Sequence, residues 1–325
     1  METIRACSIW RALEVIGDVP VLLVLEQSFL GTSSFEAIVE KTGLPRSVVS
    51  DRLKKLVAED CLGKNVARAS RRAKYQLTEK GRDLFPIALA MLFWQHRWET
   101  GKRKFIVRIH HSRCGRSIEP RPACDHCAEE IKAHEVDWKP GPGLAQVAPD
   151  YSRRRRPSKS ITARREGGAL VDTLIGIFGD RWSTLIVRAM FTGIHRFDQI
   201  QQDTLMASNI LSGRIDELIE SGILCATLYN DHPPRHEYRL TGKGRDLYPV
   251  ILGMLQWGDK YYAAEQGPPL LLQHRICDKP LTMVMACSVC AEELRAGELD
   301  FSIEAITGAD IEANAAGTNT AKRKA

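Results

Sequence analysis

The sequence has no apolar run of about 18 or more residues, so it predicts no helix that spans a bilayer. Its first ten residues, METIRACSIW, carry charges and no continuous apolar stretch, which is not typical of a secretory signal. We therefore expect a cytoplasmic protein with no membrane partner. In that reducing compartment the nine cysteines are better candidates for metal ligands or redox thiols than for structural disulfides.

The sequence signatures of common enzymes are missing as well. It contains no glycine-rich phosphate loop, no Ser-x-x-Lys or Gly-x-Ser-x-Gly motif and no convincing pair of carboxylates. The acidic residues are instead spread along the faces of predicted helices. We therefore expect the protein not to be an enzyme.

Positive charge is modest in total but locally concentrated. The formal net charge is +6, and the segment between Asp150 and Gly168 holds seven Lys or Arg residues against one acid, Glu166. Because the preceding KPGPG (139–143) breaks regular structure, residues 139–167 are predicted to be a flexible basic linker. It is either a plain solvated tether or one that contacts phosphates. Residues 305–325 are rich in alanine and polar residues and are predicted to be a disordered tail.

Much of the chain is present twice. LTEKGRDLFP (77–86) returns as LTGKGRDLYP (240–249) at an offset of 163 residues, and EVIGD (14–18) corresponds to GIFGD (176–180) at an offset of 162. A repeat of this length indicates a duplicated domain and not a solenoid unit.

The second copy shows the order of elements most clearly. Apolar periodicity predicts helices over 168–178, 181–191, 197–204 and from 208 to Gly222, then two short strands and a helix over 244–263. This is the order of a winged helix-turn-helix domain. We expect a mainly α fold with small β wings, in which each of two tandem winged helix domains is followed by a small, zinc-ribbon-like Cys/His lobe. The predicted winged helix domains are residues 1–100 and 168–264. The predicted Cys/His lobes are residues 101–138 and 265–304.

The second copy closely resembles the HxlR-type winged helix transcriptional regulators. The resemblance follows GDRWSTLIVRAMFTG, NILSGRIDELIESGIL and DHPPRHEYRLTGKGRDLYP within residues 168–263, and it extends more loosely to residues 7–99. It implies a regulator that binds double-stranded DNA. We expect this regulator to be sequence-specific and to act as a repressor. The resemblance also implies a homodimer paired through its terminal helices, a need that a tandem chain can satisfy as an intramolecular pseudo-dimer.

Candidate DNA-binding residues lie on the second helix of each helix-turn-helix and on the wings. In the first copy they are Arg46, Ser47, Ser50, Arg52, Lys54, Lys55, Arg71 and Arg72. In the second copy they are Ser208, Asn209, Ser212, Arg214, Arg235 and His236. Arg52 and Arg214 occupy equivalent positions from which each reaches either a phosphate or a neighbouring acid. Because Asp216 and Glu217 stand where the first copy has Lys54 and Lys55, we expect the first copy to bind the phosphates of the DNA backbone more tightly.

Each copy ends in the same ligand-like pattern: His-x2-Cys, nine intervening residues, then Cys-x2-Cys. Three thiolates and one imidazole suit tetrahedral zinc. The sets read along the chain are His111, Cys114, Cys124 and Cys127 in the first copy and His274, Cys277, Cys287 and Cys290 in the second. We expect one closed structural zinc in each lobe. Redox thiols and plain buried cysteines are the alternatives, and His110 is a second candidate ligand.

Three further cysteines lie outside this pattern. Cys7 precedes the first helix, where several HxlR-type regulators carry a redox-reactive cysteine, although simple packing also explains it. Cys61 and Cys225 lie beside the wing strands and are expected in the core. The alternative function that remains open is therefore a winged-helix module that binds protein or senses redox state and has little DNA binding of its own.

Overall fold

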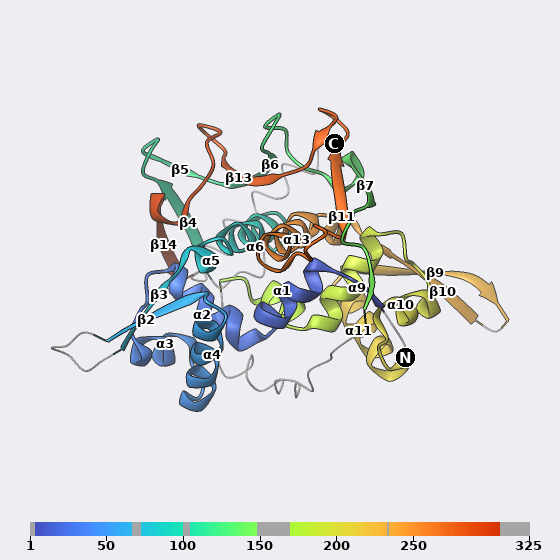
Figure 1. Cartoon of the computed structure of the whole chain (residues 1–325), viewed down its shortest axis with the longest axis horizontal. Helices are drawn as coiled ribbons and strands as arrows, with labels where there is room; N and C mark the ends of the chain where they lie inside the picture. Colours follow the sequence, from blue (N-terminus) through green and yellow to red (C-terminus); the bar gives the residue numbers. More distant parts are fainter. Residues whose placement is uncertain (1–3, 67–72, 100–104, 148–169, 233, 306–325) are drawn as a thin grey trace.

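The structure is a computed structural model that describes residues 4–66, 73–99, 105–147, 170–232 and 234–305 (Figure 1). The first repeat contains four helices, a hairpin, a short helix, a long helix and a set of strands. Its elements are β1 (Ile4–Arg5), α1 (Ser8–Ile16), α2 (Val19–Phe29), α3 (Phe35–Thr42), α4 (Arg46–Ala58), β2 (Leu62–Val66), β3 (Ala73–Leu77), α5 (Glu79–Arg82), α6 (Phe85–Trp98), β4 (Phe105–His111), β5 (Arg116–Ile118), β6 (Pro120–Cys124), η1 (Ala133–Glu135), β7 (Val136–Pro140) and β8 (Gln146–Val147).

The second repeat follows the same order, which confirms the predicted winged helix-turn-helix arrangement. Its elements are α8 (Asp172–Phe178), α9 (Arg181–Phe191), α10 (Phe197–Thr204), α11 (Ser208–Glu220), β9 (Leu224–Asp231), β10 (Pro234–Leu240), α12 (Gly242–Arg245), α13 (Tyr248–Tyr262), β11 (Leu270–His274), β12 (Lys279–Pro280), β13 (Met283–Cys287), η2 (Ala296–Glu298) and β14 (Leu299–Ala305). Within the described ranges, no helix is long and apolar enough to cross a membrane.

Side-chain caps set the start of corresponding helices in the two repeats. Asp18 caps α2 and Asp180 caps α9, each by accepting a backbone N–H in the first turn. Thr78 and Thr241 cap α5 and α12 in the same way, at 3.1 and 3.0 Å from the capped nitrogens of Gly81 and Gly244. Since these caps recur at the repeat offset, local sequence places the same helix boundaries in both copies.

The two repeats pack against each other through their first and last helices. Helix α13 of the second repeat lies along α1 and α6 of the first. At Gly258 of α13 an added Cβ would overlap the backbone of Ser8, so this close approach requires glycine. The contact is reciprocal: the indole Nε1 of Trp94 donates to the carbonyl of Lys243 at 2.9 Å, and that of Trp257 donates to the carbonyl of Lys80 at 3.0 Å. The chain therefore forms an intramolecular pseudo-dimer.

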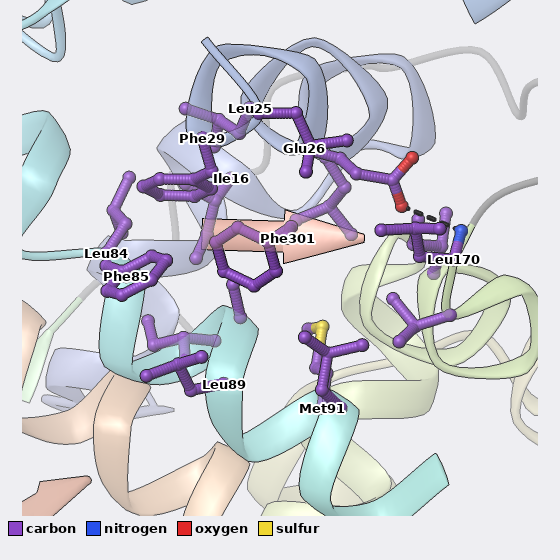
Figure 2. A pocket seen from close by; sticks show the side chains of 17 residues that line it. Ile16, Leu25, Glu26, Phe29, Leu84, Phe85, Leu89, Met91, Leu170 and Phe301 are labelled. Carbon is purple, nitrogen blue, oxygen red and sulfur yellow. Dashed lines mark hydrogen bonds between the residues drawn. The ribbon is translucent and has the colours of Figure 1, made fainter. Parts of the chain in front are cut away.

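A small apolar cavity marks one junction between the repeats. It is bordered by α2 and α6 of the first repeat and by residues of the second, including Phe301 of β14 (Figure 2). At its rim the carboxylate of Glu26 accepts the N–H of Leu170 at 3.0 Å. The cavity volume is about 70 Å³. Pockets for drug-sized ligands are larger, from about 300 Å³, so we treat the cavity as a feature of the packing.

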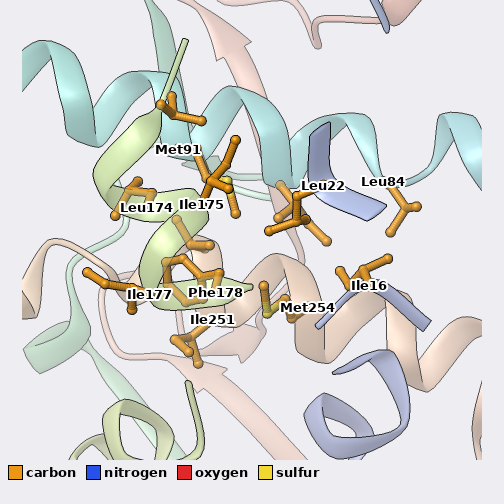
Figure 3. Close-up of a cluster of buried hydrophobic side chains, with 14 of the residues drawn as sticks. Ile16, Leu22, Leu84, Met91, Leu174, Ile175, Ile177, Phe178, Ile251 and Met254 are labelled. Carbon is orange, nitrogen blue, oxygen red and sulfur yellow. The ribbon is translucent and has the colours of Figure 1, made fainter. Parts of the chain in front are cut away.

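A single hydrophobic core spans both copies. Figure 3 shows Phe178 of α8 beside Ile251 and Met254 of α13, while Met91 of α6 lies nearer to Ile175 of α8. Phe178, Leu174 and Met254 are completely buried. Because the core has no boundary between the repeats, their positions are fixed relative to each other as rigidly as elements within one domain.

Strands β4, β5, β6, β7, β11, β13 and β14 form a layer on the other side of α6 and α13 from α4 and α11 (Figure 1). Every long pairing in this layer crosses between the repeats: β4 with β14, β6 with β13, and β7 with β11, all antiparallel. The short strands β5 and β12 then extend the outer sheets within their own repeat. The expectation of two separate Cys/His lobes, 101–138 and 265–304, is therefore wrong, because each region is half of a shared layer.

The predicted start of the flexible linker, residue 139, is also wrong. Residues 139–147 are ordered: β7 continues to Pro140 and pairs with β11, and β8 pairs with β1. Between them, the N–H groups of Gly141 and Gly143 donate to the carbonyls of Pro269 and Pro268, and an added Cβ at either glycine would overlap that backbone. Proline and glycine here permit a close backbone crossing and do not mark flexibility. Residues 148–167 of the predicted linker and 306–325 of the predicted tail lie outside the described residues.

Candidate nucleic-acid interface and metal centres

Helices α4 and α11, the second helices of the two helix-turn-helix units, lie along the edge of the molecule opposite the strand layer (Figure 1). Each buries one stripe in the core. The buried apolar residues are Val49, Leu53 and Leu56 in α4 and Leu211, Ile215 and Leu218 in α11. Since the stripe recurs at helical spacing, the opposite face of each helix is left for solvent or a partner.

The exposed face of α4 carries positive charge and small polar groups. Arg46, Ser47 and Lys54 are exposed, and Ser50 is half-buried. Arg46 makes a two-pronged ion pair with Glu36 and lies 4.9 Å from the centre of the Phe35 ring. Both partners of that ion pair are more than 60% exposed. An exposed pair contributes little stability, so the guanidinium is available to exchange its carboxylate for a phosphate.

Two other predicted DNA contacts on α4 are engaged inside the domain. Arg52 forms two hydrogen bonds with the carboxylate of Asp18, at 3.0 and 2.8 Å. Lys55 donates to the carbonyls of Glu14 and Val15, both at 2.6 Å, at the C-terminal end of α1. A cation at the end of a helix stabilises its unpaired carbonyls. Of the two roles left open for Arg52, the structure shows the contact with a neighbouring acid.

Replacing Arg52 with alanine is expected to lower the free energy of unfolding by about 1–2 kcal/mol, because it leaves the largely buried Asp18 carboxylate without its cation. Lys54→Ala is the matched control, since Lys54 is exposed on the same helix and its loss should change stability by less than about 0.5 kcal/mol. Urea denaturation of both variants measures this. Equal destabilisation by the two changes would show that the Asp18 contact carries no special weight.

The exposed face of α11 is polar but less positive. Ser208, Asn209, Ser212 and Asp216 are exposed. Arg214, in contrast, is 8% exposed, contacts the carboxylate of Asp180 and lies 3.3 Å from an oxygen of Glu217. Arg214 thus repeats the arrangement of Arg52 at the equivalent position and neutralises part of the acidic pair on its own helix.

The wings differ between the repeats. In the hairpin β2–β3, Lys64 and Lys74 are exposed, whereas the predicted contacts Arg71 and Arg72 lie outside the described residues. The hairpin β9–β10 exposes Arg235 and His236. It also exposes two apolar side chains, Leu228 (47%) and Tyr229 (42%).

The eight predicted metal ligands form two groups, as expected, but not the two groups read along the chain. One group is His111 and Cys114 with Cys287 and Cys290; the other is Cys124 and Cys127 with His274 and Cys277. In each group all ligand atoms lie within 4.8 Å of one another. The prediction of one site per repeat is therefore wrong: each His-x2-Cys half meets the Cys-x2-Cys half of the other repeat.

The distances within each group suit a single tetrahedral ion. Zinc bonds of about 2.3 Å to sulfur and about 2.0 Å to nitrogen imply roughly 3.8 Å between two sulfurs and roughly 3.5 Å between sulfur and nitrogen. The Sγ atoms of Cys114 and Cys287 are 4.0 Å apart, and Cys290 Sγ is 3.6 Å from Nδ1 of His111. In the second group, Nδ1 of His274 lies 3.3 Å from Cys127 Sγ and 3.4 Å from Cys277 Sγ.

Strand pairing explains why the halves cross. Strand β6 ends at Cys124, which lies opposite Met283, and β13 ends at Cys287, which lies opposite Pro120. Each Cys-x2-Cys turn is thereby carried away from its own His-x2-Cys turn and towards that of the other repeat. His110, the second candidate ligand, is exposed and lies outside both groups.

The thiols differ in their electrostatic surroundings. Burial raises the pKa of Cys124, but N–H donors from Cys127 and His126 and the neighbouring thiols outweigh this and hold the pKa below its ordinary value. Burial raises the pKa of Cys61 to about 11, so this thiol stays protonated and unreactive in the core. Cys225, also expected in the core, is instead exposed, and Cys7 is half-buried at the N-cap of α1.

Two residues beside the metal-ligand groups were missed from the sequence. Glu135 and Glu298 stand just before β7 and β14, and each has one buried carboxylate oxygen without a hydrogen-bond partner among the described residues. Oε2 of Glu298 lies 3.9 Å from Nε2 of His111, and Glu135 is adjacent to Val136, which pairs with His274 in the sheet. The signal that could have found them is positional: they occupy equivalent places at the repeat offset of 163.

Two curated relatives each match less than half of this chain. The HTH-type transcriptional regulator Rv3095 of Mycobacterium tuberculosis (strain ATCC 25618 / H37Rv) is 37% identical over 137 residues, which are 42% of this chain and 87% of the relative. YdeP, an HTH-type transcriptional regulator of Bacillus subtilis (strain 168), is 34% identical over 95 residues, 29% of this chain and 74% of the relative. Both relatives are thus about half as long as this chain or shorter.

Two solved structures are similar over part of the chain. The crystal structure of PA1607, a proposed transcription factor, is 32% identical, covers 43% of this chain and 99% of its own, and has a TM-score of 0.39. The redox regulator HypR in its oxidized form is 29% identical, covers 28% of this chain and 96% of its own, and has a TM-score of 0.27. The model of the HxlR-like helix-turn-helix matches residues 15–103 and 177–266, more than half of the chain. The chain therefore belongs to the HxlR-like helix-turn-helix family and carries the family's domain twice.

Proposed function

We propose that this protein is a sequence-specific DNA-binding transcriptional regulator, a repressor, that reads duplex DNA with both of its winged helix-turn-helix domains. The observation that carries the proposal is the paired placement of α4 and α11. Each buries an apolar stripe and presents a polar face, and both lie along one edge of a molecule with a single core (Figure 1). The relatives named as transcriptional regulators support the same function.

We propose that the two winged helix domains make different contacts with DNA. The exposed Arg46 and Lys54 suit phosphate contacts, together with the wing cations Arg71 and Arg72. Asn209 and Ser212 are uncharged and exposed on α11, and such groups suit hydrogen bonds to base edges. Because the two faces differ, the best operator should have two unlike half-sites and not a palindrome.

Repression is proposed to follow from occupancy alone. A monomer already holds two readers in a fixed arrangement, so it needs no second subunit to bind two half-sites. Bound in this way, the protein would cover its operator and exclude other DNA-binding proteins. The enzyme alternative has no support in the described geometry, in which the only clusters of potential metal ligands carry a complete set of four protein groups.

Zinc is the proposed cofactor of both Cys/His groups, in a structural role. Three thiolates and one imidazole form the donor set of closed structural zinc sites, which leave no position for a substrate. The ligands at each site come equally from the two repeats, so a bound ion would add a crosslink between them. The crosslink lies in the strand layer, away from α4 and α11, and its proposed role is to brace the pseudo-dimer.

The proposed function predicts that the full chain binds duplex DNA with a steep dependence on salt. Because the protein is expected to neutralise several phosphates, raising the salt concentration from about 50 to 200 mM should lower the affinity by about 10- to 1,000-fold. Fluorescence anisotropy of a labelled duplex at several salt concentrations measures the slope. No binding up to micromolar protein, or a flat response to salt, would contradict DNA binding and favour a protein-interaction module.

A protein-interaction role is the second candidate for one part of the molecule. Leu228 and Tyr229 are exposed on the hairpin β9–β10, where the first repeat has a more basic wing. Exposed apolar side chains on a hairpin suit a protein contact better than a phosphate contact. A second repeat that binds protein would leave the first as the only DNA reader, and the duplex would then need a single half-site.

A further inference from the structure

The ligand histidines have one ring nitrogen directed at the thiols and the other directed away from them. In His111 and His274 it is Nδ1 that faces the sulfurs, at 3.3–3.6 Å. Both side chains are completely buried. Their Nε2 atoms are also buried, and neither has a hydrogen-bond partner among the described residues. A buried N–H without an acceptor costs free energy, so these two atoms need an explanation.

A carboxylate stands next to this unpartnered nitrogen. Oε2 of Glu298 lies 3.9 Å from Nε2 of His111 and is itself buried with no hydrogen-bond partner in the described part of the chain. The backbone holds it there, because the carbonyl of Glu298 accepts the N–H of Ser112 at 2.9 Å and the next residue, Leu299, pairs with His111 in the sheet.

The second group repeats the backbone placement and the unpartnered atoms. Glu135 is the equivalent of Glu298, and its Oε2 is likewise buried without a partner. Its carbonyl accepts the N–H of Arg275 at 2.8 Å, and the next residue, Val136, pairs with His274. Two buried donors and two buried acceptors, all without partners, thus recur at equivalent positions. Because the backbone pairing is also the same at both sites, the approach of Glu298 to His111 is the pattern that we extend to Glu135 and His274.

We propose that Glu298 and Glu135 are positioning residues of the two metal centres. Each carboxylate accepts the Nε2–H of the histidine from the other repeat, which fixes the ring so that Nδ1 is the metal ligand. Carboxylates play this part behind many ligand histidines, where they set the tautomer and raise the basicity of the ligand. The inference rests on the proposed zinc sites, and it adds a fifth residue to each of them.

The remaining oxygen of each carboxylate points to a cation. Oε1 of Glu298 lies 3.9 Å from Arg113, and Oε1 of Glu135 lies 3.3 Å from Lys132. These contacts hold one oxygen of each carboxylate on its own repeat and leave Oε2 as the oxygen without a partner. Each glutamate belongs to the same repeat as the Cys-x2-Cys turn of its site, so one repeat supplies the turn and the carboxylate that hold the other repeat's histidine.

The test measures zinc affinity of the full chain by competition with the chromophoric chelator 4-(2-pyridylazo)resorcinol. In Glu298→Leu, one of the two ions should bind about 10- to 100-fold more weakly while the other keeps its affinity. Glu135→Leu should weaken only the other ion. Glu298→Gln, whose amide oxygen can still accept a hydrogen bond, should recover part of the loss. Glu292→Leu is the matched control, because Glu292 also contacts Arg113, at 3.1 Å, but does not face a histidine.

Nitrogen-15 NMR of the histidine rings distinguishes a glutamate that positions the ligand histidine from a glutamate that only stabilises the fold. The zinc-bound wild type should show metal on Nδ1 and a slowly exchanging proton on Nε2 of His111, and Glu298→Leu should lose that slow proton even at saturating zinc. Unchanged affinity and an unchanged Nε2–H signal in both glutamate variants would overturn the inference and leave zinc binding intact. A wild-type protein that binds no zinc would instead overturn the proposed metal centres themselves.

Discussion

Removing three cysteines of one metal-ligand group should release one zinc and leave the other at wild-type affinity, even though the three cysteines come from both repeats. Cys124, Cys127 and Cys277 supply every thiolate of one group, and the other group keeps all four of its ligands. The triple change to serine should therefore give protein with one ion per chain by native mass spectrometry. Because zinc ligation contributes free energy to folding, its melting temperature should also fall.

The matched variant changes the same number of cysteines within one repeat. Replacing Cys114, Cys124 and Cys127 with serine strips two thiolates from one group and one thiolate from the other. It should lose one ion completely and hold the second far more weakly against a chelator. If the metal sites were instead formed within each repeat, the two variants would exchange behaviour, and that exchange would refute the shared sites.

Neutralising the exposed face of α4 should abolish most of the DNA affinity without unfolding the protein. Arg46, Ser47 and Lys54 are exposed, and none of them is part of the hydrophobic core. Their joint replacement by alanine should weaken duplex binding by about 100-fold, since each lost contact costs about 1–3 kcal/mol at most. The salt slope should fall by about two, one for each cation removed. Anisotropy titrations of the variant and the wild type measure both quantities.

The control removes the same positive charge from the far side of the molecule. Arg116 and Lys279 are exposed on β5 and β12 of the strand layer, away from α4 and α11 (Figure 1). Their replacement by alanine should leave the affinity within a few-fold of wild type. Comparable losses in both variants would mean that binding follows the total charge of the protein, and α4 would then have no specific role at the DNA surface.

The order of helices and the duplication could be predicted because their signals are local. Caps such as Asp18 and Thr78 recur in both repeats, and the apolar stripe of α11 repeats at helical spacing. The residues of the metal centres could also be predicted, because three cysteines and a histidine at the same spacing in two places are a chemical signature. These features depend on neighbours within a few residues.

The contacts of single cations could not be predicted in the same way. Arg52 and Lys54 are both basic residues of one helix, yet Arg52 meets Asp18 while Lys54 is exposed. Helical spacing placed Arg52 at the edge of the stripe and left two partners open. The choice was made by the position of α2 against α4, which is a contact between residues 34 apart in the chain.

The sequence by itself determined the duplicated winged helix domains, the starts of their helices and the eight residues of the Cys/His groups. Only the tertiary structure decided which halves of those groups join and which carboxylates stand behind the histidines. In a duplicated sequence each His-x2-Cys segment has two possible Cys-x2-Cys partners with the same local chemistry. The spacing of the residues therefore does not distinguish between the two partners. The pairing of β6 with β13, of β4 with β14 and of β7 with β11 made the choice, because it brings each half beside the other repeat.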